Sequence, residues 1–189
     1  MGMAATTRTG WTAEMVRAIP SDRNRHEVIE GELSVTPSPA LPHQYAAGEL
    51  YYLLRLYLSD HPVAQAVIAP SDVEFDWQNM VEPDVFVLPL VEGRRPRSVE
   101  EAGSLLLVVE VLSPSSARSD RHSKRKLYQR FRVPQYWIVD LDARVVERWR
   151  PDDERPEILT DTVDWQPDPA HPPFVVDLPV FFQRVCGDQ

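Results

Sequence analysis

Hydrophobic and polar positions along the chain change period several times, and each change marks an expected element. Residues 26–38 hold two short apolar runs on either side of Glu30-Gly31, which is typical of a hairpin. Apolar residues then recur at helical spacing after a proline-rich start, at Ala47, Leu50, Tyr51, Leu54 and Leu58. Prolines are tolerated just before a helix begins, so the pattern predicts a strand pair followed by a helix.

The middle of the chain has the composition of buried strands. Residues 64–89 predict three strands with a turn at Gln78-Asn79, and a polar connector follows. Residues 105–112, LLLVVEVL, predict a strand that is apolar on both faces and therefore covered on both sides. Residues 117–133 predict a helix that is capped by Ser119 or Asp120.

The last third of the chain returns to short strands. Residues 134–150 predict two strands joined by a turn, the acidic and proline-rich stretch 151–173 predicts a loop that includes one strand, and 174–182 predicts a strand and a short turn. This order indicates an α/β (α+β mixed) fold with a central mixed β-sheet flanked by helices. We expect residues 1–23 to form an N-terminal extension with a short helix, and residues 24–189 to form a single domain.

A carboxylate interrupts the most apolar of these strands. Alternation places Leu106, Val108 and Glu110 on one face of strand 105–112, and an ionised group without a partner there would cost several kcal/mol. In the following helix, Lys124 shares one face with the apolar residues Leu127, Tyr128 and Phe131. The chain from Glu110 to this helix can therefore bring Lys124 back over Glu110.

A second acid stands at the start of another strand. Pro83 marks the beginning or the edge of a strand, and Asp84 follows it directly. Each residue alone has a structural explanation: Asp84 as a turn residue, Glu110 as an acid satisfied by a buried arginine or by backbone groups, and Lys124 as a side chain that extends along the apolar face. Together, two acids on strands and an inward lysine indicate a hard-cation site.

Composition and charge indicate the cellular location of the protein and the kind of partner it binds. The sequence has no apolar run long enough to span a membrane, begins without a secretory signal and contains one cysteine, so we expect a cytoplasmic protein. The net charge of −9 argues mildly against a nucleic-acid partner. The helix over 117–133 is nevertheless basic, and its candidates for phosphate contacts are Arg118, Arg121, Arg125 and Lys126.

Several segments in this order resemble one family. HEVIEGELSVTPSP and a following histidine, then EPDVFVL, LLLVVEVLSPSSARSDRHSKRKLYQRF, VPQYWIVD and a late VVDLPVFF are similar to the Uma2 family of endonuclease-like proteins. That family belongs to the PD-(D/E)XK nuclease superfamily, and the resemblance spans about residues 24–183. It implies a restriction-endonuclease-like fold with a metal-dependent nuclease site.

The resemblance also assigns roles to residues of this chain. It implies that Asp84, Glu110 and the backbone carbonyl of Val111 hold Mg²⁺ or Mn²⁺, and that Asp84, Glu110 and Lys124 are catalytic. The lysine of the plain E-x-K pattern would stand at Leu112, so this chain departs from that pattern, and Lys124 on the next helix takes its place.

Further positions match the family pattern, but more than one role is open for each. Four of them are candidates to complete the metal shell or to support the structure: Glu27, Glu32, His43 and Asp120. Tyr128 and Trp137 also match, and we interpret both as packing residues.

Two other function classes remain open on the sequence. The first is a catalytically inactive nuclease-fold module that binds nucleic acid or a protein partner. The second is a hydrolase of another substrate, including an acid-pair glycosidase, against which the basic helix argues. We also expect that the chain forms a homodimer, because nucleases that cut both strands often pair, and that it has no membrane partner.

Overall fold

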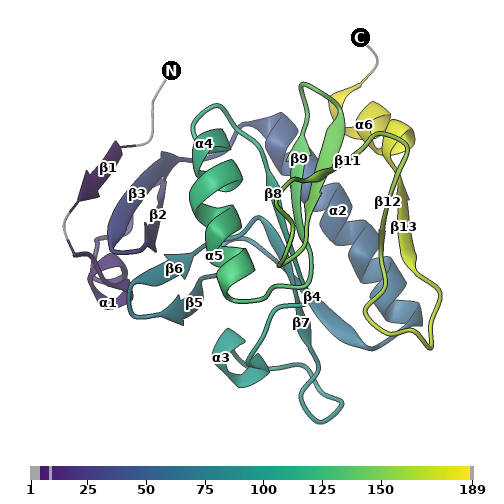
Figure 1. Cartoon of the computed structure of the whole chain (residues 1–189), viewed down its shortest axis with the longest axis horizontal. Helices are drawn as coiled ribbons and strands as arrows, with labels where there is room; N and C mark the ends of the chain where they lie inside the picture. Colours follow the sequence, from purple (N-terminus) through teal and green to yellow (C-terminus); the bar gives the residue numbers. More distant parts are fainter. Residues whose placement is uncertain (1–4, 9, 188–189) are drawn as a thin grey trace.

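A mixed β-sheet forms the centre of the molecule (Figure 1). In the computed structural model, which describes residues 5–8 and 10–187, the sheet has the order β11-β10-β9-β8-β7-β4. Its strands are β4 (Ala64–Ile68), β7 (Val85–Pro89), β8 (Leu107–Val111), β9 (Tyr136–Asp140), β10 (Val145–Trp149) and β11 (Glu157–Leu159). The β8–β9 pair is parallel and the other pairs are antiparallel, so the expected mixed sheet is confirmed.

A second sheet lies on the N-terminal side, in the order β1-β3-β2-β6-β5. Its strands are β1 (Ala5–Arg8), β2 (Asn24–Ile29), β3 (Glu32–Pro37), β5 (Val73–Asp76) and β6 (Asn79–Val81). The expected hairpin turn is present, with Glu30 and Gly31 at φ of 52° and 75°, as a tight turn between antiparallel strands requires. Strands β1 and β6 were not predicted, because strands of three or four residues carry little periodicity.

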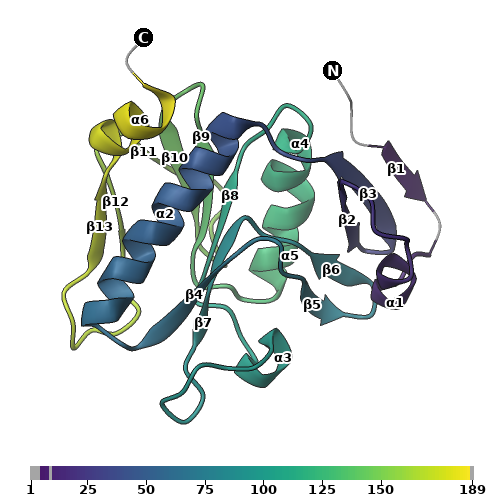
Figure 2. The same ribbon diagram turned by 180° about the vertical axis from the view of Figure 1, so that it is seen from behind.

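Helices cover both faces of the central sheet, as the two opposed views in Figures 1 and 2 show. On one face lies α2 (Leu41–Asp60), whose predicted stripe packs on the core: Ala47, Leu50, Leu54 and Leu58 are buried, and Tyr51 is partly buried. The short helix α1 (Ala13–Arg17) instead packs on β2 of the N-terminal sheet.

The C-terminal segment is more helical than expected. A two-stranded sheet of β12 (Thr162–Trp165) and β13 (Phe174–Asp177) leads into α6 (Leu178–Cys186), where we predicted only a short turn. The Asp177 side chain accepts a hydrogen bond from the Val180 N–H and so caps the helix, with a proline in its first turn. The helix packs against α2.

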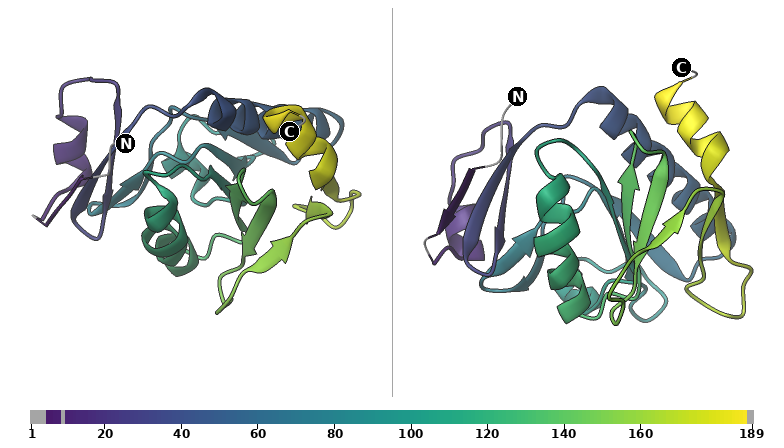
Figure 3. Two further views of the ribbon diagram at one scale, coloured as in Figure 1. Left: turned by 90° about the horizontal axis from the view of Figure 1, so that it is seen from above. Right: turned by 45° about the horizontal axis from the view of Figure 1, so that its top comes forward.

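The opposite face of the central sheet carries one continuous helical segment (Figure 3, left). It consists of α4 (Ala117–Ser119), the π-helical turn η1 (Asp120–Lys124) and α5 (Arg125–Arg130). The predicted cap at Ser119 or Asp120 is wrong, because the helix already begins at Ala117. Another short helix, α3 (Val99–Ala102), lies in the connector before β8. Within the described part of the chain, none of the helices is long and apolar enough to cross a membrane.

Strand β8 is buried along its whole length, so the expectation of two covered faces is confirmed. Val109 and Val111 join the core beneath α2, whereas Val108 packs in the core beneath α5. The strand is shorter than the predicted 105–112, and Leu105 packs with Val108 instead of Val109 because it precedes the regular alternation. Glu110 thereby points to the side on which η1 and α5 lie.

Candidate functional site

The predicted acids and the predicted lysine converge where the two sheets meet. Asp84 directly precedes β7, Glu110 is the fourth residue of β8, and Lys124 ends η1. Their side chains are almost fully buried, with relative exposures of 2%, 1% and 1%. Four further polar residues join this charge cluster from β2, α2 and η1: Arg25, Glu27, His43 and Asp120.

Asp84 is held by three donors. Its Oδ2 accepts hydrogen bonds from the Val111 N–H at 2.8 Å and lies 3.0 Å from Nε2 of His43, and its Oδ1 accepts from Nη2 of Arg25 at 2.8 Å. Burial raises the pKa of this carboxyl group, but the His43 hydrogen bond, the Arg25 charge and the Val111 N–H outweigh burial and hold the pKa below its usual range. Asp84 is therefore a stable buried anion.

Glu110 has the opposite electrostatic balance. Its Oε1 accepts hydrogen bonds from Nζ of Lys124 at 3.0 Å and from the hydroxyl group of Tyr128 at 2.9 Å. Burial raises its pKa well above the ordinary value, Lys124 offsets this in part, and the charges of Asp84 and other nearby acids raise it further. The expected Lys124–Glu110 contact is present, and Tyr128 both packs and donates to Glu110, so our interpretation of Tyr128 as a packing residue alone was incomplete.

Lys124 is surrounded by three carboxylates. Its Nζ lies 2.9 Å from Glu27, 3.0 Å from Glu110 and 3.6 Å from Asp120. Burial lowers the pKa of the ammonium group, but the three negative charges raise it above its usual value, so Lys124 stays charged. Burial also raises the pKa of Asp120 to about 6.

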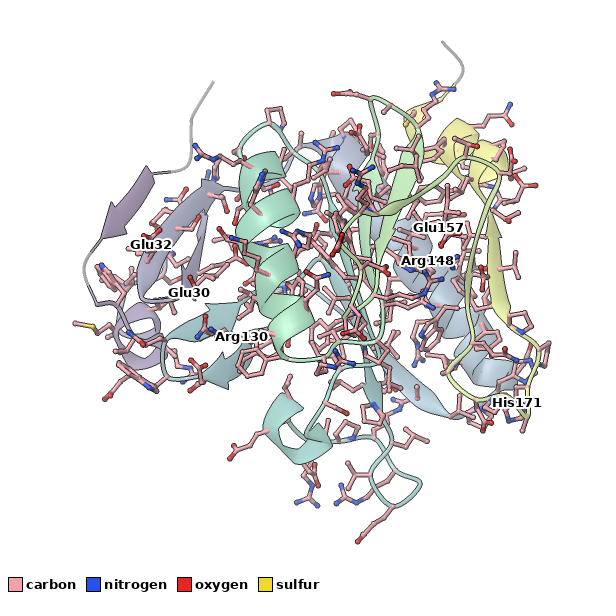
Figure 4. The ribbon with its side chains drawn as sticks, viewed as in Figure 1. Glu30, Glu32, Arg130, Arg148, Glu157 and His171 are labelled. Atoms are coloured by element: carbon pink, nitrogen blue, oxygen red, sulfur yellow. The ribbon has the colours of Figure 1, made fainter. Side chains whose placement is uncertain are left out.

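The four candidates for the metal shell or for structural support, Glu27, Glu32, His43 and Asp120, separate into two groups. Glu27, His43 and Asp120 belong to the charge cluster through the contacts given above, and Glu27 also accepts the Glu82 N–H at 2.9 Å. Glu32 lies opposite Ile29 at the turn end of the β2–β3 hairpin, and Figure 4 draws it on the outer part of the N-terminal sheet near β1. The structure thus gathers three of the four candidates around the acids.

Sequence reasoning did not single out Arg25. Its Nε donates to Glu82 at 2.9 Å, its Nη2 donates to Asp84, and its Nη1 lies 4.0 Å from Glu110. The guanidinium group therefore lies between the two predicted metal ligands. Strand alternation carried a signal for it, because Arg25 stands two residues before Glu27 and so shares its strand face.

A cavity of about 150 Å³ opens beside Arg25 and His43. Its remaining walls are the segment 36–40 before α2 and the loop 113–116 after β8, with three serine hydroxyl groups in that loop. Arg25 retains 16% side-chain exposure, so the charge cluster reaches solvent there. The buried Nδ1 of His43 has no hydrogen-bond partner within the described residues.

The donor types suit a hard divalent cation. Asp84 and Glu110 supply carboxylate oxygens, and the Val111 carbonyl lies on the same strand edge as the Val111 N–H that reaches Asp84. Within residues 5–8 and 10–187, however, no group of three or more His, Cys, Asp and Glu is arranged as a metal site. Arg25 and Lys124 instead contact the oxygens of these acids.

The predicted basic surface is only partly free of acidic partners. Arg118 and Lys126 are exposed on α4 and α5. Arg121 instead lies 2.8 Å from Asp140 and 2.6 Å from Glu147, so nearby acids balance its charge.

Two more arginines of this helical segment are engaged within the fold. Arg125 stacks over the Trp149 ring at 4.8 Å. Arg130 reaches the N-terminal sheet, where its Nη1 lies 3.5 Å from Glu30 (Figure 4).

Comparisons with known proteins agree with this architecture. A solved structure from Anabaena variabilis ATCC 29413, described as "a putative nuclease belonging to DUF820", matches with a TM-score of 0.70 and 18% sequence identity, over 92% of this chain and 98% of that one. The chain therefore shares the fold of that protein. No curated protein matches the sequence.

The sequence itself gives the family. The family model Uma2, described as "Putative restriction endonuclease", matches residues 13–180. The chain belongs to the Uma2 family, as the sequence resemblance indicated.

The charge cluster predicts a large stability effect at Lys124. We expect Lys124→Met to lower the free energy of unfolding by about 3–5 kcal/mol, because it leaves three buried acids without their shared cation. Urea denaturation followed by circular dichroism measures this loss. The matched control is Lys126→Met on the exposed side of α5, where we expect a change within about 0.5 kcal/mol. Equal losses in the two variants would contradict the assigned network.

Proposed function

We propose that the chain is a Mg²⁺- or Mn²⁺-dependent endonuclease that hydrolyses phosphodiester bonds of nucleic acid, with DNA as its substrate. The observation that carries the proposal is the meeting of Asp84 and Glu110 around Arg25, beside a cavity that reaches solvent. Membership of the Uma2 family supports the nuclease class.

The cavity supplies suitable contacts for a phosphate group. Arg25 offers a guanidinium group with a planar arrangement of donors, which matches phosphate oxygens. His43 and the serines of loop 113–116 add polar groups on the same walls. A phosphodiester in this cavity would lie next to Asp84, which both Arg25 and His43 contact.

Lys124 is suited to a fixed role in this arrangement. It stays charged and is held by three acids, which argues against proton transfer from its ammonium group. We assign to it the fixing of the Glu110 carboxylate and the stabilisation of negative charge at the site. The hydroxyl group of Tyr128 donates a hydrogen bond to the same oxygen of Glu110.

The metal would bind between the acids. Asp84, Glu110 and the carbonyl of Val111 would hold it, and it would supply positive charge to the phosphate and acidify the attacking water. Arg25 now lies between these two acids, so it must leave at least Asp84 for the metal to bind there. In its new position Arg25 would remain within the cavity and could contact the phosphate.

The position of Arg25 also supports the second candidate function. If Arg25 is a permanent counter-ion of Asp84 and Glu110, the fold is a catalytically inactive module that binds nucleic acid or a protein partner. The two functions differ in whether a divalent cation can replace the guanidinium group. A cytoplasmic location, expected from the sequence, is compatible with either.

Cleavage assays test the nuclease directly. We expect the wild type to cut plasmid DNA with Mg²⁺ or Mn²⁺ and to stop in EDTA. Asp84→Asn and Glu110→Gln should each lower the rate at least about 10²- to 10³-fold with an unchanged circular dichroism spectrum, because each removes an anionic ligand. Glu32→Gln, which changes an acid outside the charge cluster, should keep the wild-type rate.

The outcomes of this assay separate the alternatives. Cutting that survives in Asp84→Asn and Glu110→Gln would identify a contaminating nuclease. A wild type that cuts no DNA or RNA, single- or double-stranded, under any of these metal conditions would favour the inactive module.

Metal titration tests the competition with Arg25. We expect isothermal titration calorimetry to show Mn²⁺ binding by the wild type. The dissociation constant of Arg25→Gln should be lower by about tenfold or more, because the neutral side chain no longer competes for Asp84. The control is Arg55→Gln on α2, with an expected affinity equal to the wild type. Weaker binding by Arg25→Gln would mean that Arg25 does not compete with the cation.

The salt dependence of DNA binding tests the basic surface. We expect Arg118→Gln and Lys126→Gln each to reduce the slope of log affinity against log salt by about one, since each removes a free phosphate contact. Arg121→Gln should leave the slope nearly unchanged, because Asp140 and Glu147 already balance this charge. Fluorescence anisotropy with a labelled duplex in EDTA measures the slopes, and equal reductions in all three variants would contradict the distinction.

A further inference from the structure

The outward face of α2 carries a row of large apolar side chains. Leu41, Tyr45, Tyr52 and Leu56 are exposed by 67%, 57%, 55% and 48%. Their spacing of four, seven and four residues puts all four on one face of the helix. Figure 2 shows α2 lying in front of the central sheet on this side.

This row lies opposite the buried face of the same helix. Leu50, Leu54 and Leu58 point into the core beneath α2, so the helix is apolar on both sides. A surface helix normally has a polar outer face, and a helix that is apolar all round is normally covered on all sides. The outer row therefore indicates that another surface covers α2.

The row is symmetric about its own middle. Leu41 and Leu56 are equally far from the point between Gly48 and Glu49, and so are Tyr45 and Tyr52. A second α2 running antiparallel across a two-fold axis at this point would place leucine against leucine and tyrosine against tyrosine. Such self-complementarity is the defining feature of a two-fold homodimer interface.

Gly48 occupies the centre of the row. Glycine lowers helix stability relative to alanine, so its presence inside α2 calls for a reason. The fold provides none, since a Cβ at Gly48 would meet nothing within 4 Å. A glycine beside the two-fold axis allows two helix backbones to approach closely, which supplies the reason.

The apolar row supplies about half of the area that a pair of chains needs. The exposed parts of the four apolar side chains add up to about 400 Å² per chain, as much as the largest apolar patches of ordinary monomers. A stable dimer buries about 800 Å² per partner. The polar residues along both edges of α2 and the adjoining α6, which carries the 42% exposed Val180, can supply the remaining contact area.

We propose that the outer face of α2 is the interface of a homodimer, with the second copy's α2 antiparallel and the two-fold axis between Gly48 and Glu49. The inference stands apart from the proposed nuclease activity, because none of the apolar residues in the row belongs to the charge cluster. It concerns only how two copies of this chain associate.

Sedimentation velocity of the full chain over a range of concentrations tests the dimer. We expect a wild-type dimer, and at least a tenfold higher dissociation constant for Tyr52→Glu. The control is Ile158→Glu on β11, which changes an equally exposed apolar residue away from α2 and should leave the dimer intact. A monomeric wild type at the highest concentration, or equal dimers in all three proteins, would overturn the proposal.

Gly48→Leu separates association from folding. The added side chain has room within the chain and improves helix propensity, so the variant should melt at least as high as the wild type at concentrations where both are monomeric. It should nevertheless raise the dimer dissociation constant at least tenfold, because it pushes the two helices apart. An unchanged dissociation constant would overturn the central position of Gly48.

Disulfide trapping tests the antiparallel arrangement, in a Cys186→Ser background that removes the native thiol. We expect Tyr45→Cys combined with Tyr52→Cys to form covalent dimers on mild oxidation. Leu41→Cys alone should not, because in the antiparallel pair the two copies of residue 41 are about 22 Å apart along the helix. Efficient crosslinking through residue 41 alone would indicate a parallel pair and overturn the geometry.

Discussion

Glu110 and Lys124 are buried on the same side of the central sheet, and each makes the other tolerable. A single ionised group at this depth would cost several kcal/mol. Here the Lys124 ammonium group and the Tyr128 hydroxyl group both donate hydrogen bonds to Oε1 of Glu110. Other elements around the site hold this pair in place or add charges to it. The π-helical turn ends at Lys124, and β2 supplies Glu27 as a second acid to the same ammonium group. An acid-rich cluster can therefore exist inside an apolar core.

The parts of the site that sequence reasoning predicted are those with a local signal. Glu110 interrupts an apolar strand, and Lys124 stands on the apolar face of a helix, so their meeting could be expected from spacing alone. Arg25 gave a weaker signal, its place on the same strand face as Glu27, and an arginine near the start of a short strand usually faces solvent. Its role depends on the β2–β6 pairing, which brings together residues far apart in the sequence. The same limit applies to Arg121, whose acidic partners lie on β9 and the adjoining β10.

The fold shows the same division between local and long-range information. The Glu30-Gly31 turn, α2 and the alternation within β8 have strong local patterns and are found where expected. Strand β6 has three residues and α3 four, too few for a period to show. The predicted cap of the α4–η1–α5 segment is wrong because the two capping residues, Ser119 and Asp120, lie inside a helix that continues through them. Their capping propensity yields to the packing of this segment on the sheet.

Arg25 and α2 have one property in common: each is stable in the isolated chain, and each is placed where a binding partner would be expected. A guanidinium group between two acids is stable without any other cation, yet it holds the position that a divalent ion would need. Likewise, α2 is stable with its inner face buried, yet its outer face has the composition of an interface. In both places the contacts within the isolated chain are sufficient for folding. What remains, a guanidinium group at a cavity wall and an apolar row around Gly48, is better explained by a binding partner than by the stability of the isolated chain.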